Sequence, residues 1–197
     1  MQKEIGSFFG KALVIAIFII FVILVAQFNS LAKPGIIITQ IFFSFTGVLL
    51  GFTIFKLEFS VMMTGMGIIA VAGIVVKNAI LIIDYTDQIY AQYEDKRAAL
   101  VEAAAIRLTP VLLTALSTIL GLLPLAIGMN FNFETLFTRL DPQFYWGGDN
   151  ASFWNPLAWT IIFGLTFTTI LTLIVVPAMY AIVIARRDEK RARKDGR

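Results

Sequence analysis

The sequence lacks two residue types that build many protein sites, because it contains no cysteine and no histidine. Their absence excludes a disulfide framework and any metal site that needs a thiolate or an imidazole from this chain. Charged residues are also scarce, at 15% of the 197 positions, whereas hydrophobic residues make up 58% and the mean hydropathy is +0.84. An ordinary soluble domain does not have this composition. We therefore expect an integral membrane protein.

Long apolar runs predict one all-α transmembrane domain, over residues 1–197, with five membrane-spanning helices. Each run is long enough or apolar enough to cross the hydrocarbon core of a bilayer, which takes about 20 helical residues. The first run resembles the apolar part of a signal peptide, but no small-residue cleavage site follows it, so we expect it to be retained. The predicted spans are about 11–28, 36–55, 61–83, 108–128 and 157–185.

Positive charge is concentrated at the carboxyl end of the chain. Residues 186–197 carry seven Lys or Arg against three acids, while the formal net charge of the whole chain is only +3. A basic segment can bind nucleic acid, but beside a last apolar span it favours a cytoplasmic anchor under the positive-inside rule. This orientation predicts a cytoplasmic loop 84–107, an external loop 129–156 and an external amino terminus. Lys3 and Lys11 would then be translocated, which favours a fragment of a longer protein or one half of a split one.

The two long loops differ in character. The cytoplasmic loop contains good helix formers with mixed charges, and we expect residues 95–106 to form an amphipathic helix. The external loop combines aromatic residues with turn formers such as Gly147-Gly148. These aromatics favour an interfacial belt at the outer surface, and a surface that contacts substrate is the alternative. They are Phe131, Phe133, Phe137, Phe144, Tyr145, Trp146, Phe153 and Trp154.

A lysine inside the third apolar run is the main candidate for function. Lys77 lies seven residues before Asp84, about 10 Å into the membrane at the helical rise. Its side chain could snorkel to the interface, but helical side chains lean toward the amino terminus of their helix. In this span that end faces outside, so the Lys77 side chain leans deeper into the membrane, away from the nearby cytoplasmic surface. We therefore favour a buried partner. Lys77 shares a helical stripe with positions 70, 73, 80 and 84, and Ala70 and Gly73 would let another helix approach closely.

The following span, 107–128, offers a counterpart to Lys77. Thr114 lies seven residues after Arg107, again about 10 Å from the cytoplasmic side, so antiparallel packing would bring Lys77 and Thr114 to a similar depth. A lone Thr hydroxyl commonly bonds its own helix backbone, and that alternative stays open. The polar and small stripe of this span comprises Arg107, Pro110, Thr114, Ser117, Thr118, Gly121, Leu125 and Gly128.

The chain offers Lys77 no acidic partner at its own depth. Neither Thr114 nor Asn78 can neutralise an ammonium group, and every Asp and Glu lies in a loop, in a tail or at the end of a span, with Asp84 the nearest. The carboxylate must therefore come from another chain or segment, or Lys77 must be neutral. A lysine whose charge depends on a movable proton is typical of an ion-coupled transporter.

Two segments resemble a known family. GIVVKNAILIIDYTDQ (73–88) and EAAAIRLTPVLLTALSTILGLLPLAIG (102–128) are similar to the penultimate helices of the resistance-nodulation-division (RND) efflux pumps, in particular the hydrophobe/amphiphile multidrug branch. The resemblance is close over 61–128 and extends in hydropathy over all five spans, which implies the carboxy-terminal membrane half, from the eighth helix to the twelfth. Two features depart from the family pattern: Thr109, where the common motif has a second arginine, and the long aromatic loop 129–156.

The resemblance implies roles for four residues. Lys77 matches the membrane lysine that pairs with two aspartates of the fourth helix, and Thr114 matches the threonine of the same proton relay. Arg107 matches an arginine implicated in proton passage on the cytoplasmic side, and Asn78 accompanies the lysine in the motif. The implied function is proton-driven export of amphiphilic or hydrophobic compounds, with H⁺ as coupling ion and no other cofactor.

The resemblance also implies a location and partners. The location is the bacterial inner membrane, which the chain crosses several times with its carboxyl terminus in the cytoplasm. The partners are an amino-terminal half with the aspartate pair and the periplasmic domains, further copies in a homotrimer, a periplasmic adaptor, an outer-membrane channel and membrane lipids, but not nucleic acid.

Two other classes of function compete with export. A non-transporting interaction subunit, or a split or degenerate fragment, would keep the fold without pumping. We do not expect an enzyme, because the chain has no His or Cys and no intramembrane Ser or Asp placed with a base. Only Lys77 could serve as a base for Thr114, Ser117 or Thr118.

Overall fold

The computed structural model describes residues 2–90, 93, 96–132, 137–138, 140 and 143–195. Within these ranges the side chains of Gln2, Tyr90, Lys96, Arg97, Phe131 and 184–195 are not described. Several features predicted from the sequence therefore lie outside the described side chains. They are the charges of the basic tail 186–197 and the external-loop residues Phe131 and Phe133.

The described part of the chain contains five helices that are long and apolar enough to cross a membrane, which confirms the all-helical membrane fold. They are α1 (Gln2–Phe28), α2 (Ala32–Phe55), α3 (Val61–Tyr90), α4 (Lys96–Ala126) and α6 (Asp149–Asp195). Between α4 and α6, two short strands pair in antiparallel fashion: β1 (Met129–Phe131) and β2 (Phe144–Trp146). No pattern in the sequence predicted these strands.

The helices extend beyond the apolar spans predicted from the sequence. α3 and α4 occupy most of the predicted cytoplasmic loop 84–107, and the amphipathic helix predicted at 95–106 is the first part of α4 rather than a separate element. α6 likewise begins inside the predicted external loop 129–156. An apolar run marks only the stretch that hydrocarbon surrounds, whereas the helix itself continues wherever the next residues favour it.

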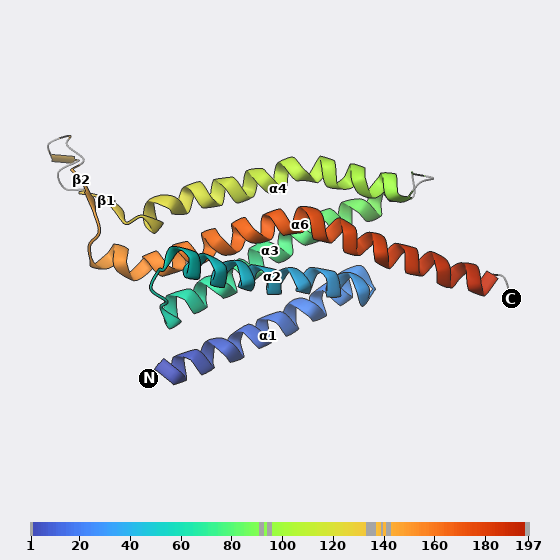
Figure 1. Ribbon diagram of the computed structural model, residues 1–197, viewed down its shortest axis with the longest axis horizontal. Helices are drawn as coiled ribbons and strands as arrows, with labels where there is room; N and C mark the ends of the chain where they lie inside the picture. Colours follow the sequence, from blue (N-terminus) through green and yellow to red (C-terminus); the bar gives the residue numbers. More distant parts are fainter. Residues whose placement is uncertain are drawn as a thin grey trace.

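Helix α6 lies at the centre of the bundle. It packs against α2, α3 and α4, while α1 packs against α2 and α3 at one side. Consecutive helices run in opposite directions, so the amino terminus and the β1–β2 pair lie at one end of the bundle and the carboxyl terminus projects from the other (Figure 1). We call the first of these the ribbon end and the second the opposite end.

Close contact between α2 and α6 depends on small residues. A Cβ atom built on Gly51 would lie 2.2 Å from the ring of Phe163, which leaves no room for a side chain. Such close approach gives the van der Waals packing that drives helix association in a membrane. A buried hydrogen bond joins the same helices, because the Thr172 hydroxyl donates to Oε1 of Gln40 at 3.1 Å.

Helix α1 exposes large apolar side chains along most of its length. In water this surface would be unfavourable, but hydrocarbon solvates it without cost. The exposure is therefore that of a lipid-facing or protein-facing membrane helix. The exposed residues of α1 include Phe8, Val14, Ile15, Phe18, Ile19, Val22 and Ile23.

Candidate functional site

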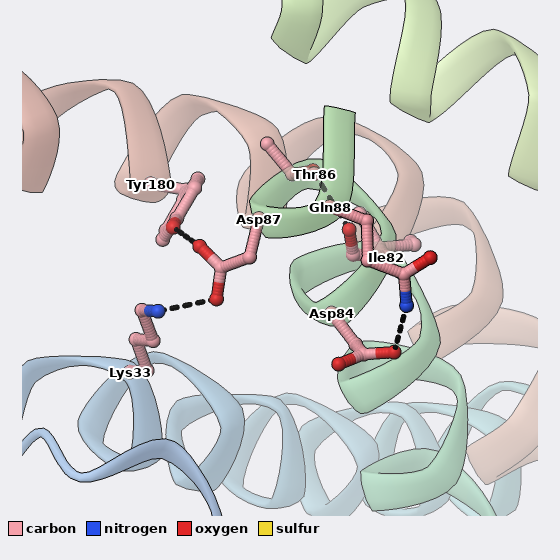
Figure 2. Close-up of polar contacts among 7 residues, drawn as sticks. All are labelled: Lys33, Ile82, Asp84, Thr86, Asp87, Gln88 and Tyr180. Atoms are coloured by element: carbon pink, nitrogen blue, oxygen red, sulfur yellow. Dashed lines mark hydrogen bonds and ion pairs between the residues drawn. The ribbon is translucent and has the colours of Figure 1, made fainter. Parts of the chain in front are cut away.

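Lys77 projects from an exposed face of α3. Ala70 and Gly73 share this face, and a Cβ atom built on Gly73 would meet no atom within 4 Å. Among the described residues, Lys77 makes no hydrogen bond and no ion pair. Asp84, the nearest acid in the sequence, accepts a hydrogen bond from Nε2 of Gln88 at 2.8 Å instead (Figure 2). The described helices leave the small-residue face around Lys77 uncovered, since Ala70, Gly73 and Lys77 are all exposed.

Asn78 lies on the other side of α3 from Lys77. Consecutive helical residues are rotated by about 100°, and this rotation carries Asn78 into the bundle, where it is 5% exposed. The structure therefore does not place the two side chains together. Asn78 belongs to the buried face of α3, whereas Lys77 belongs to its open face.

Arg107 fixes the register between α3 and α4. Its guanidinium carbon lies 4.4 Å from the centroid of the Tyr85 ring, in a cation–π contact. Lys77 precedes Tyr85 by eight residues and Thr114 follows Arg107 by seven, so both lie roughly 10–12 Å from this contact at the helical rise. Because the two helices are antiparallel, Lys77 and Thr114 lie at similar depth. The Nε atom of Arg107 is buried and has no hydrogen-bond partner in the described part of the chain.

Thr114 is bonded to its own helix. Its hydroxyl donates to the Val111 carbonyl at 3.0 Å, and its carbonyl accepts from the Thr118 hydroxyl at 2.8 Å. This is the local bonding that competes with a relay role. No hydrogen bond joins Lys77 to Thr114 within the residues that the structure describes. The two residues share a depth, and their roles in a relay stay predictions.

A second charged cluster, which the sequence did not reveal, lies at the opposite end of the bundle. Lys33 of α2 forms an ion pair with Asp87 of α3, and Tyr180 of α6 donates a hydrogen bond to the other oxygen of the same carboxylate (Figure 2). The side chains of Lys33 and Asp87 are 12% and 33% exposed. The ammonium also lies 5.5 Å from the centroid of the Phe28 ring. This cluster joins three helices at one point.

Comparison with known proteins identifies the family of the chain. Residues 2–131, more than half of the chain, match the model of the AcrB/AcrD/AcrF family. The chain belongs to the AcrB/AcrD/AcrF family. It is thus a member of the RND efflux transporters, which confirms the family resemblance at this level.

Three curated proteins are similar to most of the chain. Swarming motility protein SwrC of Bacillus subtilis (strain 168) is 34% identical over 181 residues, covering 92% of this chain and 16% of SwrC. Multidrug resistance protein MdtC of Erwinia tasmaniensis is 31% identical over 191 residues, covering 89% of this chain and 17% of MdtC. Cobalt-zinc-cadmium resistance protein CzcA of Cupriavidus metallidurans is 30% identical over 175 residues, covering 89% of this chain and 15% of CzcA.

A solved structure supports the same fold. The X-ray crystal structure of a heavy metal efflux pump, crystal form II, superposes with a TM-score of 0.67 at 26% identity and covers 86% of this chain and 15% of the pump. The chain spans about a sixth of the length of the curated relatives named above, or 15–17% of each. Because their names range from swarming motility to multidrug resistance and cobalt-zinc-cadmium resistance, they support the RND family but not one substrate branch.

Proposed function

We propose that this chain forms the carboxy-terminal membrane half of a proton-driven RND exporter of amphiphilic or hydrophobic compounds. It contributes Lys77 and Thr114 to the proton relay, with Arg107 on the path of the proton and Asn78 supporting the helix from its buried side. H⁺ is the coupling ion, and the chain carries out transport rather than enzymatic chemistry.

The proposed setting is the bacterial inner membrane, with the carboxyl terminus in the cytoplasm. The chain works beside an amino-terminal half that bears a pair of aspartates and the periplasmic domains. The complete exporter is a homotrimer that engages a periplasmic adaptor and an outer-membrane channel. Membership of the AcrB/AcrD/AcrF family, whose named relatives are several times longer than this chain, supports this arrangement.

The observation that carries the proposal is the open face of α3 around Lys77. An ammonium group at this depth costs about 2.5–3.5 kcal/mol on insertion scales, and the described helices provide no carboxylate to offset that cost. Ala70 and Gly73 leave room beside the lysine for a closely packed helix. A helix with carboxylates at that level would fit both the charge and the space.

Such a pair couples protonation to helix position. While the docked carboxylate is ionised, it attracts Lys77 and holds the two helices together. Protonation of the carboxylate removes this attraction, so the equilibrium between two arrangements of the bundle shifts. The membrane potential supplies about 2.3 kcal/mol per charge for each 100 mV to drive the cycle.

A metal ion is the second candidate for the exported substrate. The relative CzcA is named for cobalt, zinc and cadmium resistance, and the superposed structure is a heavy metal efflux pump. The relative MdtC is named for multidrug resistance. The apolar spans of this chain are as compatible with a transporter of amphiphiles as with one of metal ions. The substrate assay must therefore offer both classes.

The proposal is tested by Lys77→Met in the complete transporter, reconstituted in liposomes with an imposed proton gradient. Efflux of a lipophilic cationic dye and of Zn²⁺ is measured separately. We expect the wild type to move the dye and the variant to lose most proton-driven efflux, while Lys11→Met, which removes an exposed lysine of α1, keeps it. Undiminished efflux by Lys77→Met, with as much reconstituted protein as for the wild type, would show that Lys77 has no role in the mechanism. Efflux of Zn²⁺ without efflux of the dye would show that the transporter exports metal ions. Efflux of neither the dye nor Zn²⁺ would favour an interaction subunit.

A further inference from the structure

The β1–β2 ribbon has two chemically different faces. The register pairs Met129 with Trp146 and Asn130 with Tyr145, and side chains along a strand alternate between its faces. Met129, Phe144 and Trp146 therefore share one face, which is apolar. Asn130 and Tyr145 share the other face, which carries an amide and a phenol. The ribbon is thus a small amphipathic sheet.

The apolar face of the ribbon is largely uncovered by the described chain. Phe144 is 63% exposed and Trp146 is 66% exposed. Large aromatic side chains gathered in this way are unusual on a surface that faces only water, and they mark a surface that binds something. Residues 143–148 carry no charge, so the contact that they make is not an ionic one.

Hydrogen bonds close the base of the ribbon, and a further bond joins the two membrane helices beside it. The Gly147 amide donates to the Gly128 carbonyl at 2.8 Å, and Nδ2 of Asn130 donates to the Gly147 carbonyl at 2.6 Å. Below them, the side chain of Asn155 in α6 donates to the carbonyl of Ala126, the last residue of α4. The base of the ribbon is therefore held at the level where α4 ends.

This attachment places the ribbon at the membrane boundary. Met129 follows the end of the apolar helix α4 by three residues, so it lies within about 11 Å of that end even if the chain is fully extended. The polar zone between hydrocarbon and water is roughly 5–7 Å thick on each side of a bilayer. The ribbon lies at the end of the bundle where α4 ends (Figure 1), so its base is close enough to reach this zone.

We propose that the face formed by Met129, Phe144 and Trp146 binds the boundary between headgroups and acyl chains in the leaflet at the ribbon end. The Trp146 indole favours this zone because its apolar body enters the acyl region while its N–H remains hydrated, and Met129 and Phe144 add apolar surface beside it. The Asn130 and Tyr145 face then points toward water. The match to the AcrB/AcrD/AcrF family model ends at residue 131, before Phe144 and Trp146. The inference does not depend on transport.

The absence of native cysteine makes the test simple, since one substitution creates one labelling site. Trp146→Cys and Tyr145→Cys are each made in the full chain, labelled with a nitroxide and reconstituted in phosphatidylglycerol and phosphatidylethanolamine vesicles. The label at position 145 is the matched control on the opposite face. We expect the label at 146 to collide several-fold more with oxygen, which concentrates in lipid, than with a water-soluble nickel complex. The label at 145 should show the reverse preference.

A second measurement leaves the ribbon intact. Fluorescence of the wild-type chain in vesicles of brominated phospholipid is compared with that of Trp146→Phe, and the difference reports Trp146 alone. Strong quenching of this difference signal by the brominated lipid supports the anchor. Access of the nickel complex to both labelled positions alike would place the ribbon in water, and protection of both from oxygen and nickel would show that protein covers it. Either result would overturn the proposal.

Discussion

Lys33 and Lys77 both belong to apolar helices, but only Lys33 has a polar partner among the described residues. Lys33 is mostly buried and pairs with Asp87, which Tyr180 also contacts. Lys77 stands on an open face and has no polar partner among the described residues. A charge that is paired within the chain is part of its internal packing. A charge left open on an apolar helix is costly in a membrane, which is why we proposed that another helix packs on this face.

The same contrast extends to the glycines of the bundle. Gly51 of α2 lies against Phe163, whereas Gly73, on the face of Lys77, borders open space. Gly51 thus allows a helix contact that the chain already makes, whereas Gly73 leaves room for a contact with another helix. If this distinction is correct, substitutions on the two surfaces should affect different properties.

The largest change in stability is expected for Gly51→Ala. The new methyl group would lie 2.2 Å from the Phe163 ring, so α2 and α6 must separate, and overpacking of this kind costs roughly 1–3 kcal/mol or more. Gly73→Ala is the matched control, with an expected change within about 0.5 kcal/mol because its methyl group meets no atom. The free energy of unfolding of the chain in detergent micelles gives the comparison. Equal losses for the two variants would show that the two surfaces do not differ.

A smaller loss is expected for Lys33→Met. This change leaves the Asp87 carboxylate with Tyr180 alone, and because Asp87 is 33% exposed, solvent screening limits the cost to about 1–2 kcal/mol. Lys77→Met should leave the stability of the isolated chain unchanged or slightly raised, since it removes an unpaired charge from the membrane. Thermal unfolding of the two variants in the same bilayer discs checks this. A larger loss for Lys77→Met would mean that Lys77 has a partner within this chain.

A double-mutant cycle would show whether the Lys33 cluster acts as one unit. Lys33 and Tyr180 both contact the Asp87 carboxylate, so the losses from Lys33→Met and Tyr180→Phe should not add. We expect a coupling energy of about 0.5–1 kcal/mol, within the usual range for residues of one network. The pair Lys77→Met and Tyr180→Phe is the control and should be additive. Additivity in both cycles would mean that the three-helix cluster is only a set of separate contacts.

The sequence predicted the helices well and the contacts between distant residues poorly. Five apolar runs were sufficient to find the five described spans, since hydrocarbon demands long apolar helices. The Lys33–Asp87 pair was missed because its members are 54 residues apart, and no local spacing connects them. One signal was available: both charges lie near helix ends that antiparallel packing brings to the same side of the membrane.

The sequence predicted the relative depth of the candidate-site residues in the membrane, but not which side of each helix the neighbouring helices cover. Lys77 and Thr114 could be placed at one level from the helical rise alone, whereas the side of the helix that the chain's own neighbours cover depends on tertiary packing. Asn78 shows the consequence, since its place in the motif suggested a role beside Lys77 but its side chain is buried on the other face. The acid partner of Lys77 could not be found, because no residue of the described chain provides it.

The smallest effect is expected for the hydrogen bond between Tyr93, in the connection between α3 and α4, and Glu102, an exposed residue in the first part of α4. A hydrogen bond to the Glu102 carboxylate raises the pKa of Tyr93 above its usual value of 10.0. A raised pKa means that the folded protein binds this proton more tightly, so the contribution is present below pH 10 and is lost as the pH rises through the folded pKa. Glu102→Gln should return the pKa toward its usual value, and Tyr93→Phe should remove that step from the tyrosinate absorbance titration. Asp84→Asn, which leaves the Glu102 carboxylate in place, is the control. An unchanged Tyr93 titration in Glu102→Gln would show that Glu102 does not bind Tyr93, in contrast to Asp87, which pairs with Lys33.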